Sequence, residues 1–339
     1  MKITIGIIAR NEASCIADMI SSLRLQDIMA RDFEFDVVVV ANGCTDNTAE
    51  VARAAFHAFD DTSVSCKVFE TEIGGKSRSW NLLVHEYTDD TSDIYVFLDA
   101  DVELCGTWAL SQVVDGLIAN PKARVCSGRA LKDIAKKPHK NIVDRFSLKV
   151  SSDTANRNAI AGGLYAGWAK ILKAIWLPEP TPGEDGFLNA MVQTTRFMEE
   201  PDFESVCQPE RITHYFESHT VKGFFRHETR MLVGTAINTW LFEYFMAQPK
   251  GTDAGQLIRA YNSQTPGWVG KVVRERIDER GWFAIPLRIP SHRLSMTNAM
   301  PIRQRLRRYP IAVAATILNF VPYVHANRVL KGRNAASYW

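Results

Sequence analysis

The chain has 339 residues, of which 46% are hydrophobic and 23% are charged. These proportions are those of a globular protein, and they exclude disordered, collagen-like and coiled-coil chains. The net charge is only +2, but residues 250–339 carry 15 Lys and Arg against 4 Asp and Glu, which predicts that this end contacts something anionic, either a phospholipid surface or a nucleic acid.

The first hundred residues alternate between short apolar stretches and amphipathic ones. The apolar stretches predict strands at residues 3–9, 36–41, 64–69 and 93–98. The amphipathic stretches between them predict helices, and this alternation builds an α/β fold with a mostly parallel sheet. Ligands bind beyond the carboxyl ends of the strands in such sheets. Chemistry is therefore expected at residues 10–12, 42–46 and 99–101.

Beyond residue 100 the pattern is less regular. It predicts a strand over 123–130 and helices over 104–119, 185–192 and 222–247. Gly162 and Gly163 lie in an apolar segment, a composition typical of backbone that passes close to a ligand. No clear pattern appears in residues 249–300, where Gly and Pro are frequent. The end of the chain is basic and then apolar, and we expect a helical C-terminal extension there.

Two aspartates, Asp99 and Asp101, flank Ala100 at the end of a predicted strand. Carboxylates this close repel each other unless a cation lies between them. Mg²⁺ or Mn²⁺ is the natural occupant, because these ions take one or two carboxylates and complete their shell with water and phosphate oxygens. The alternative is a surface turn in which Asp is simply favoured, and the motif alone does not decide between the two.

Other motifs accompany these aspartates in a fixed order. They are IARNE at 8–12, NGCTD at 42–46, GKSRSWN at 75–81 and ED at 184–185. Together they resemble the motifs of the family 2 glycosyltransferases, although the first lacks the usual proline. The resemblance implies a GT-A type, Rossmann-like α/β domain at residues 1–235, followed by a helical, basic region at 236–339.

The resemblance also implies an inverting enzyme that moves a sugar from a nucleotide diphosphate sugar to a hydroxyl acceptor. The residues that it assigns to the nucleotide at the first two strand ends are Ala9, Arg10, Glu12, Asn42 and Asp46. Asn42 stands where the family has Asp, and its amide can donate as well as accept a hydrogen bond. The alternative reading makes Asn42 part of a turn and Asp46 a helix cap.

Further donor contacts are implied downstream. The resemblance brings Lys76 to the diphosphate or the sugar, and Asn81 completes the same motif. It assigns Asp99 and Ala100 to the nucleotide sugar and Arg230 to the diphosphate. Without the resemblance, a solvated surface lysine is an equally good reading of Lys76. Arg230 is all that remains of a Gln-x-x-Arg-Trp motif of processive synthases, so processivity is not predicted.

A metal site is implied at the two aspartates. By the resemblance, Asp101 would bind Mg²⁺ or Mn²⁺ directly, and Asp99 would contact the ribose or a metal-bound water. The candidate for a further ligand is His214, with His219 as the second choice. A divalent ion there would act as a Lewis acid and neutralise the charge on the departing nucleoside diphosphate.

The general base is assigned to Asp185, with Glu184 beside it. Asp185 would take the proton of the acceptor hydroxyl as it attacks the anomeric carbon, and a neighbouring acid would raise its pKa into a useful range. A single displacement of this kind inverts the anomeric configuration. The alternative is that both acids are present only because they favour a helix N-terminus.

The cysteine pattern bears on the compartment. Six scattered cysteines without a CxxC pair indicate reduced thiols, and no secretion signal is visible at the start. We therefore expect a cytoplasmic protein.

The C-terminal stretch predicts the acceptor. The basic run 303–308 precedes an apolar run, 311–324, that is shorter than the roughly 20 residues of a spanning helix. This combination is typical of a helix that lies in a membrane interface. We expect an anionic membrane surface as partner, a lipid or lipid-linked glycan as acceptor, and release from membranes when 301–339 is deleted. The alternative is a core helix with a solvated basic face.

Two other functions compete with the glycosyltransferase. A sugar-1-phosphate nucleotidyltransferase shares a related α/β domain, but its glycine-rich loop after the first strand is not found at residues 10–12. A basic-tailed nucleic-acid-binding protein is disfavoured by acidic strand ends and by the lack of an aromatic and basic binding motif, so no nucleic acid partner is predicted.

Overall fold

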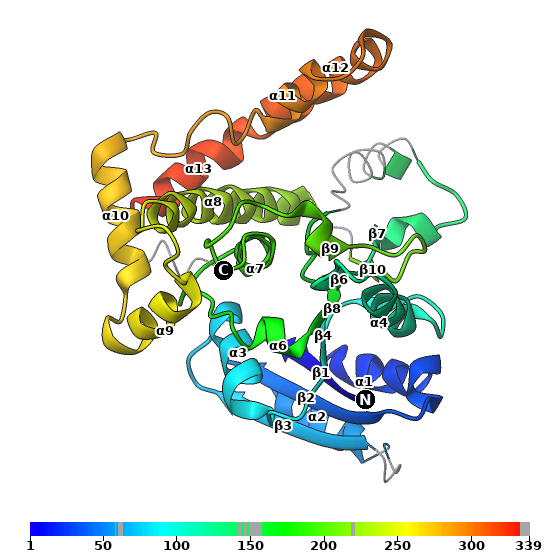
Figure 1. The fold of residues 1–339 in the computed structure, drawn as a ribbon. Coiled ribbons are helices and arrows are strands. Elements are labelled where there is room, and N and C mark those ends of the chain that lie inside the picture. Colours follow the sequence, from blue (N-terminus) through cyan, green and yellow to red (C-terminus); the bar gives the residue numbers. More distant parts are fainter. Residues whose placement is uncertain are drawn as a thin grey trace. The chain divides into compact units, whose positions relative to one another are not determined.

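The computed structural model describes residues 1–57, 59, 64–141, 144, 145, 148, 158–217 and 221–332 (Figure 1). Its packing divides the chain into two units. The first contains residues 1–177, 184–218 and 250–259, and the second contains residues 178–183, 219–249 and 260–339. The predicted domain boundary after residue 235 falls inside helix α8 (Val221–Met246), which is continuous.

A seven-stranded sheet forms the centre of the first unit. Its strands are β1 (Lys2–Ala9), β2 (Glu34–Asn42), β3 (Val64–Thr71), β4 (Ile94–Asp99), β6 (Val125–Ser127), β8 (Leu164–Trp168) and β9 (Val206–Cys207). They lie in the order β3-β2-β1-β4-β8-β6-β9. Strand β8 runs antiparallel to both of its neighbours, and the other pairings are parallel. The mostly parallel sheet predicted from the sequence is therefore confirmed.

Helices connect and cover these strands. They are α1 (Ile16–Arg24), α2 (Thr48–Phe56), α3 (Lys76–Leu82), α4 (Ala109–Ala119), α6 (Ala169–Leu172) and α7 (Glu184–Gln193), with 3₁₀ turns at Asp27–Ala30, Asp133–Lys136 and Phe203–Ser205. A π-helical turn, Leu83–Tyr87, extends α3. It packs against Gly6 of β1, where a Cβ atom would lie 2.5 Å from the Leu83 Cδ1 atom.

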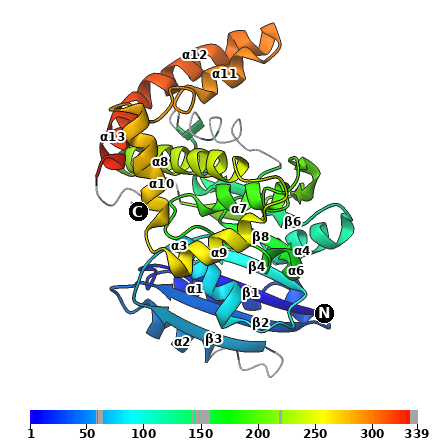
Figure 2. The same ribbon diagram turned by 60° about the vertical axis from the view of Figure 1, so that its left-hand side comes forward.

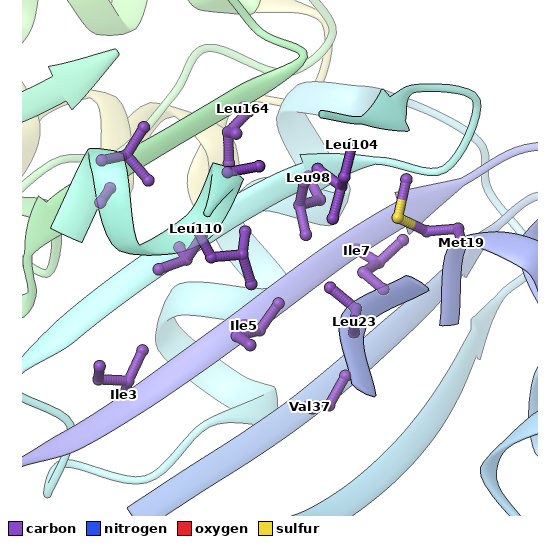
Figure 3. Close-up of a cluster of buried hydrophobic side chains, with 14 of the residues drawn as sticks. Ile3, Ile5, Ile7, Met19, Leu23, Val37, Leu98, Leu104, Leu110 and Leu164 are labelled. Carbon is purple, nitrogen blue, oxygen red and sulfur yellow. The ribbon is translucent and has the colours of Figure 1, made fainter. Parts of the chain in front are cut away.

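The main core lies on the other face of β1, against α1 and α4 (Figure 3). Side chains that fill it include Ile3, Ile5, Ile7, Met19, Leu23 and Leu110. Because β1 is buried on both faces, its sequence is an almost uninterrupted apolar run rather than an alternating one.

A small second sheet corrects two predicted elements. Its strands are β5 (Glu103–Leu104), β7 (Ala130–Lys132) and β10 (His214–Phe216), in the order β5-β10-β7. The helix predicted over 104–119 begins only at Ala109, because Leu104 pairs with His214 and Gly106 then turns with a φ of +54°. The strand predicted over 123–130 is two strands, β6 and β7, which belong to different sheets.

Helices dominate the rest of the chain. They are α8, α9 (Ala254–Gln264), α10 (Trp268–Arg280), α11 (His292–Asn298), α12 (Ile302–Leu318) and α13 (Phe320–Leu330). The helical C-terminal extension is thus confirmed, but three of its helices lie where no pattern was found. Helix α10 was not predicted because many charged residues stand between its buried residues in the sequence. The buried residues include Val269, Val272 and Ile277.

The last two helices join into one. Asn319 keeps a helical backbone, so helix continues from Ile302 to Lys331 across a stretch where the sequence offered only a short apolar run. Among the described residues, this 30-residue helix is the one with sufficient length and apolar composition to cross a membrane, and 33% of its apolar window is buried. Figure 2 shows α11 alongside α12.

Candidate active site

Strands β1, β2 and β4 end next to one another. Ala9 is paired with Ala41, and Ile8 is paired with Asp99. Because these strands are parallel, the loops that follow them meet at one edge of the sheet. Ala9 itself is fully buried, and its carbonyl accepts a hydrogen bond from the Cys44 thiol.

The loop after β1 is fastened to the loop after β2. Asn11 Oδ1 accepts from the Thr45 N–H (2.7 Å), and Asp46 Oδ2 accepts from the Ala13 N–H (3.2 Å). Asp46 Oδ1 also accepts from the hydroxyl and the backbone N–H of Thr48, and the hydroxyl bond lowers the pKa of Asp46. These contacts match the capping role that the sequence left open for Asp46, and its nucleotide contact stays a prediction.

Asn42 fastens the glycine loop that precedes α3. Its side chain is buried, and its Oδ1 accepts from the Gly75 N–H (2.7 Å). Gly43 has a φ of +57°, and a Cβ atom there would lie 2.7 Å from the Gly74 nitrogen, so only glycine fits. The amide NH₂ group and the second lone pair of Oδ1 remain for any contact of Asn42 with a base. Arg10 is exposed, and its guanidinium carbon lies 3.6 Å from where a Cβ on Gly74 would be.

Asn81 makes two hydrogen bonds inside the fold, and its predicted donor contact stays a prediction. It is 2% exposed, its Oδ1 accepts from the Leu177 N–H, and its Nδ2 donates to the Leu177 carbonyl, both at 2.9 Å. The two bonds join α3 to the segment that follows α6. A sequence motif cannot distinguish such a bond from a ligand contact, because a buried amide suits both.

Replacing Asn81 by Ala should destabilise the fold. Two hydrogen bonds to the Leu177 backbone would be lost, and losing a bond to a buried group costs about 1–3 kcal/mol. We expect urea unfolding to show a loss of about 2–4 kcal/mol, with little change in the KM for a donor. Asn120→Ala, in a loop before β6, is the matched control and should be nearly neutral. A large rise in the KM for the donor with unchanged stability would instead support the predicted donor contact of Asn81.

Lys76 lies at the centre of the site. Its ammonium is 2.7 Å from Asp99 Oδ1 and 3.0 Å from Glu184 Oε1. Burial lowers the pKa of Lys76, but the charges of Asp99 and Glu184 outweigh burial and raise this pKa well above its ordinary value. Lys76 is thus a charged residue held between the end of β4 and the start of α7, and the solvated surface lysine of the alternative reading is excluded.

Asp185 is next to this ion pair. Its Oδ1 accepts from the Gly186 N–H (2.7 Å) at the start of α7. Burial, and then the charge of Glu184, raise its pKa to about 6, against the lowering effect of Lys76. Asp185 therefore exchanges protons near neutral pH, as a general base requires.

A small cavity lies between these charged groups and an aromatic wall. Its charged lining is Lys76, Asp99, Glu184 and Asp185. The wall is built by Trp80, Phe97 and Tyr165: the Phe97 ring stacks on both others, and the Trp80 Nε1–H donates to the Tyr165 hydroxyl (2.8 Å).

The sequence analysis did not identify this aromatic wall. A signal was available, because Trp80 lies inside the motif at 75–81, Phe97 precedes Asp99 by two residues, and Tyr165 follows Gly163 by two. Gly162 lines the cavity, and a Cβ atom there would lie 3.3 Å from the Lys76 ammonium.

On the other side of Asp99, the loop reaches Glu12. Asp101 is exposed, Ala100 is buried, and the Ala100 carbonyl accepts from the Cys15 thiol (3.5 Å). The same thiol donates to Glu12 Oε2 (3.1 Å). Burial raises the pKa of Glu12, although the bond from Cys15 opposes it, and the charge of Asp101 adds to the rise. Glu12 and Asp101 therefore contribute to one negative field, which suits a cation.

His214 lies on β10, and its ring is 1% exposed. Burial lowers its pKa to about 4, so the ring is neutral at pH 7, the form in which histidine binds metals. Its Nδ1 is 3.0 Å from the Thr213 hydroxyl, and its Nε2 points at Gly163, 2.7 Å from where a Cβ atom would be. His219 lies outside the described residues.

The acidic residues fit Mg²⁺ or Mn²⁺ in type. Asp99 and Asp101 supply hard oxygen donors, and such ions complete their shell with water and phosphate. Within the described part of the chain, however, no three His, Cys, Asp or Glu side chains are grouped as a metal site, so His214 is not brought together with the two aspartates. Arg230 is exposed on α8, in the second unit.

Comparison with known proteins identifies the relatives of this fold. Residues 4–161 match the family model described as glycosyl transferase family 2. A comparison with curated proteins gives no match.

Two solved structures resemble the chain. A mannosyltransferase from Pyrobaculum calidifontis, in complex with GDP-Man and Mn²⁺, is 19% identical, with 99% of this chain and 85% of that chain covered and a TM-score of 0.50. A mannosyl-3-phosphoglycerate synthase from Rubrobacter xylanophilus is 13% identical, with 74% and 77% covered and a TM-score of 0.51. At these identities the similarity concerns the fold, and the predicted GT-A fold is confirmed.

Proposed function

Because residues 4–161 belong to glycosyl transferase family 2, we propose that this chain moves a sugar from a nucleotide diphosphate sugar to a hydroxyl acceptor, with inversion at the anomeric carbon. The family match favours this activity over the sugar-1-phosphate nucleotidyltransferase. The observation that carries the proposal is one cavity lined by a lysine bound to two carboxylates and by a third carboxylate whose pKa is near 6.

Asp185 is the general base. It takes the proton of the acceptor hydroxyl as the oxygen forms a bond to the anomeric carbon and the bond to the diphosphate breaks. Glu184 is paired with Lys76, and its charge helps to raise the pKa of Asp185 to about 6. The aromatic wall of Trp80, Phe97 and Tyr165 excludes water from this side of the cavity, which strengthens the electrostatic interactions inside.

The donor is bound at the strand ends. Arg10 and Glu12 hold the nucleotide, and Asp101 and Asp99 would hold Mg²⁺ or Mn²⁺ together with the diphosphate. The metal supplies Lewis-acid stabilisation of the departing nucleoside diphosphate. Lys76 lines the cavity, and its ammonium favours the same developing negative charge.

The acceptor is a lipid or a lipid-linked glycan at the cytoplasmic face of a membrane. Two features support this proposal: the basic composition of residues 250–339, which suits an anionic membrane surface, and the six cysteines, all of them free thiols. Nucleic acid is not proposed as a partner, because the residues that line the cavity include three acids and one lysine.

Thermal-shift measurements with UDP, GDP, CDP and dTDP test the donor site. One nucleoside diphosphate should raise the melting temperature more with Mn²⁺ than without it, because a ligand that binds the native state stabilises it. Asp101→Ala should remove the metal-dependent part of the shift. Asp90→Ala, an exposed residue before β4, should keep it. If all four diphosphates fail to shift the wild type, the proposed function is wrong.

A further inference from the structure

Helix α12 carries an apolar stripe on an exposed face. The stripe consists of Ile302, Leu306, Tyr309, Val313 and Ile317, which recur every three or four residues and so share one face of the helix. Leu306 is 71% exposed and Ile317 is 66% exposed. Phe320 and Val321 continue the exposed apolar surface onto α13. A helix that packs on a water-soluble unit would normally carry polar residues here.

The opposite face of the same helix packs inside the second unit. Ala312, Ala315 and Asn319 are buried there, followed by Tyr323 and Leu330 of α13. Polar bonds anchor α13: the Tyr323 hydroxyl donates to the Ile285 carbonyl (3.0 Å), and the Ile285 N–H donates to Asn327 Oδ1 (3.1 Å). The buried face of the second half of this long helix is therefore held by protein contacts.

Arginines flank the stripe. At 100° per residue, Arg303 and Arg305 lie on either side of the line through Ile302 and Leu306. Long arginine side chains can cover apolar surface while the guanidinium stays with water or phosphate. An exposed apolar line bordered by cations is complementary to the boundary between acyl chains and anionic headgroups.

We propose that α12 lies in the plane of one leaflet of an anionic phospholipid bilayer, with the stripe facing the acyl chains, and that it does not span the membrane. The inference rests on the proposed membrane association and names the face that makes it. A spanning helix would be apolar all round, whereas this helix has arginines beside the stripe and one face that is buried against protein. The apolar residues that would permit this helix to span a membrane thus belong to two faces, the exposed stripe and the face packed against protein.

Two adjacent residues provide a matched test. Ile317 lies on the stripe and Leu318 lies 100° away from it, and both are exposed. In binding to vesicles of phosphatidylglycerol and phosphatidylcholine, Ile317→Gln should weaken affinity about tenfold, as expected when one large apolar side chain no longer enters the acyl region. Leu318→Gln should change it by less than about twofold. Deletion of 301–339 is a poorer test, because it removes the buried Tyr323 and Leu330.

Equal losses in the two variants would overturn the in-plane geometry in favour of a spanning helix. If the stripe instead joins two copies of the chain, Ile317→Gln should change the molar mass of the protein measured by light scattering and leave its affinity for vesicles normal. That result would also overturn the proposal. Hydrolysis of a nucleotide sugar separates this inference from the proposed function. If hydrolysis proceeds while Ile317→Gln binds vesicles normally, only the inference about α12 is wrong.

Discussion

Replacing Asp185 by Asn should lower kcat about a thousandfold while the nucleoside diphosphate still binds. General base catalysis contributes roughly 10²–10⁴ in rate, and an amide of the same shape cannot accept the proton of the acceptor. Binding should survive because Asn keeps the volume and can still accept the hydrogen bond from the Gly186 N–H. Turnover of donor and thermal shift with nucleotide and Mn²⁺ measure the two properties separately.

The pH dependence gives a second measurement on Asp185. Its pKa of about 6 means that the wild-type rate should rise with pH up to that value and then level off. A raised carboxyl pKa also means that the folded state holds the ionised form poorly. This loss of folding stability is absent below about pH 4, where Asp185 is protonated in both the folded and the unfolded state. It is fully present above about pH 6. Asp185→Asn should therefore unfold at higher urea than the wild type at pH 7 and at the same urea near pH 4.

Asp185→Glu serves as the control, because it keeps a carboxylate at the position and should retain more activity than the amide. A catalytic role for Asp185 is contradicted if Asp185→Asn turns over donor at the wild-type rate. If Asp185 served only to begin helix α7, Asp185→Asn should keep both activity and stability, because Asn is also favoured at helix starts.

The sequence predicted the edge of the sheet at which the site lies, and the physical reason is simple. Parallel strands end together, so the residues after each strand must meet whatever their separation in the chain, as Ile8 and Asp99 do. The pairing of Lys76 with Asp99 and Glu184 could not be predicted from the sequence in the same way. It joins three segments over more than a hundred residues, and no local pattern encodes which side chain a lysine will reach.

Two predicted contacts show the limit of motifs. Asn42 and Asn81 lie in motifs that resemble those of the family, and both have amide groups bonded to backbone inside the fold. A buried amide that supports a loop and an amide that reads a ligand have the same sequence signature. The exposed stripe on α12 presents the converse case, because its periodicity is visible in the sequence but only the packing of the other face shows that the stripe is left uncovered.

Replacing Lys76 by Gln should damage both stability and catalysis. Asp99 and Glu184 would lose their shared cation while remaining largely buried. Removing one partner of a fully buried ion pair costs about 3–5 kcal/mol, and with side chains that are 13–26% exposed we expect about 2–3 kcal/mol in urea unfolding. Lys122→Gln is the matched control: its ion pair with Glu204 is on the surface and contributes at most about 1 kcal/mol.

The pH profile separates two roles of Lys76. Its charge lowers the pKa of Asp185, so Lys76→Gln should move the midpoint of the pH–rate profile above 6 and lower the rate at neutral pH. A lysine that only binds the diphosphate would raise the KM for the donor and leave that midpoint unchanged. Because Lys76 contacts Glu184, the immediate neighbour of Asp185, we expect the midpoint to move, and an unmoved midpoint would restrict Lys76 to donor binding. A moved midpoint would show that the same lysine both pairs with Asp99 and Glu184 and lowers the pKa of Asp185 towards 6.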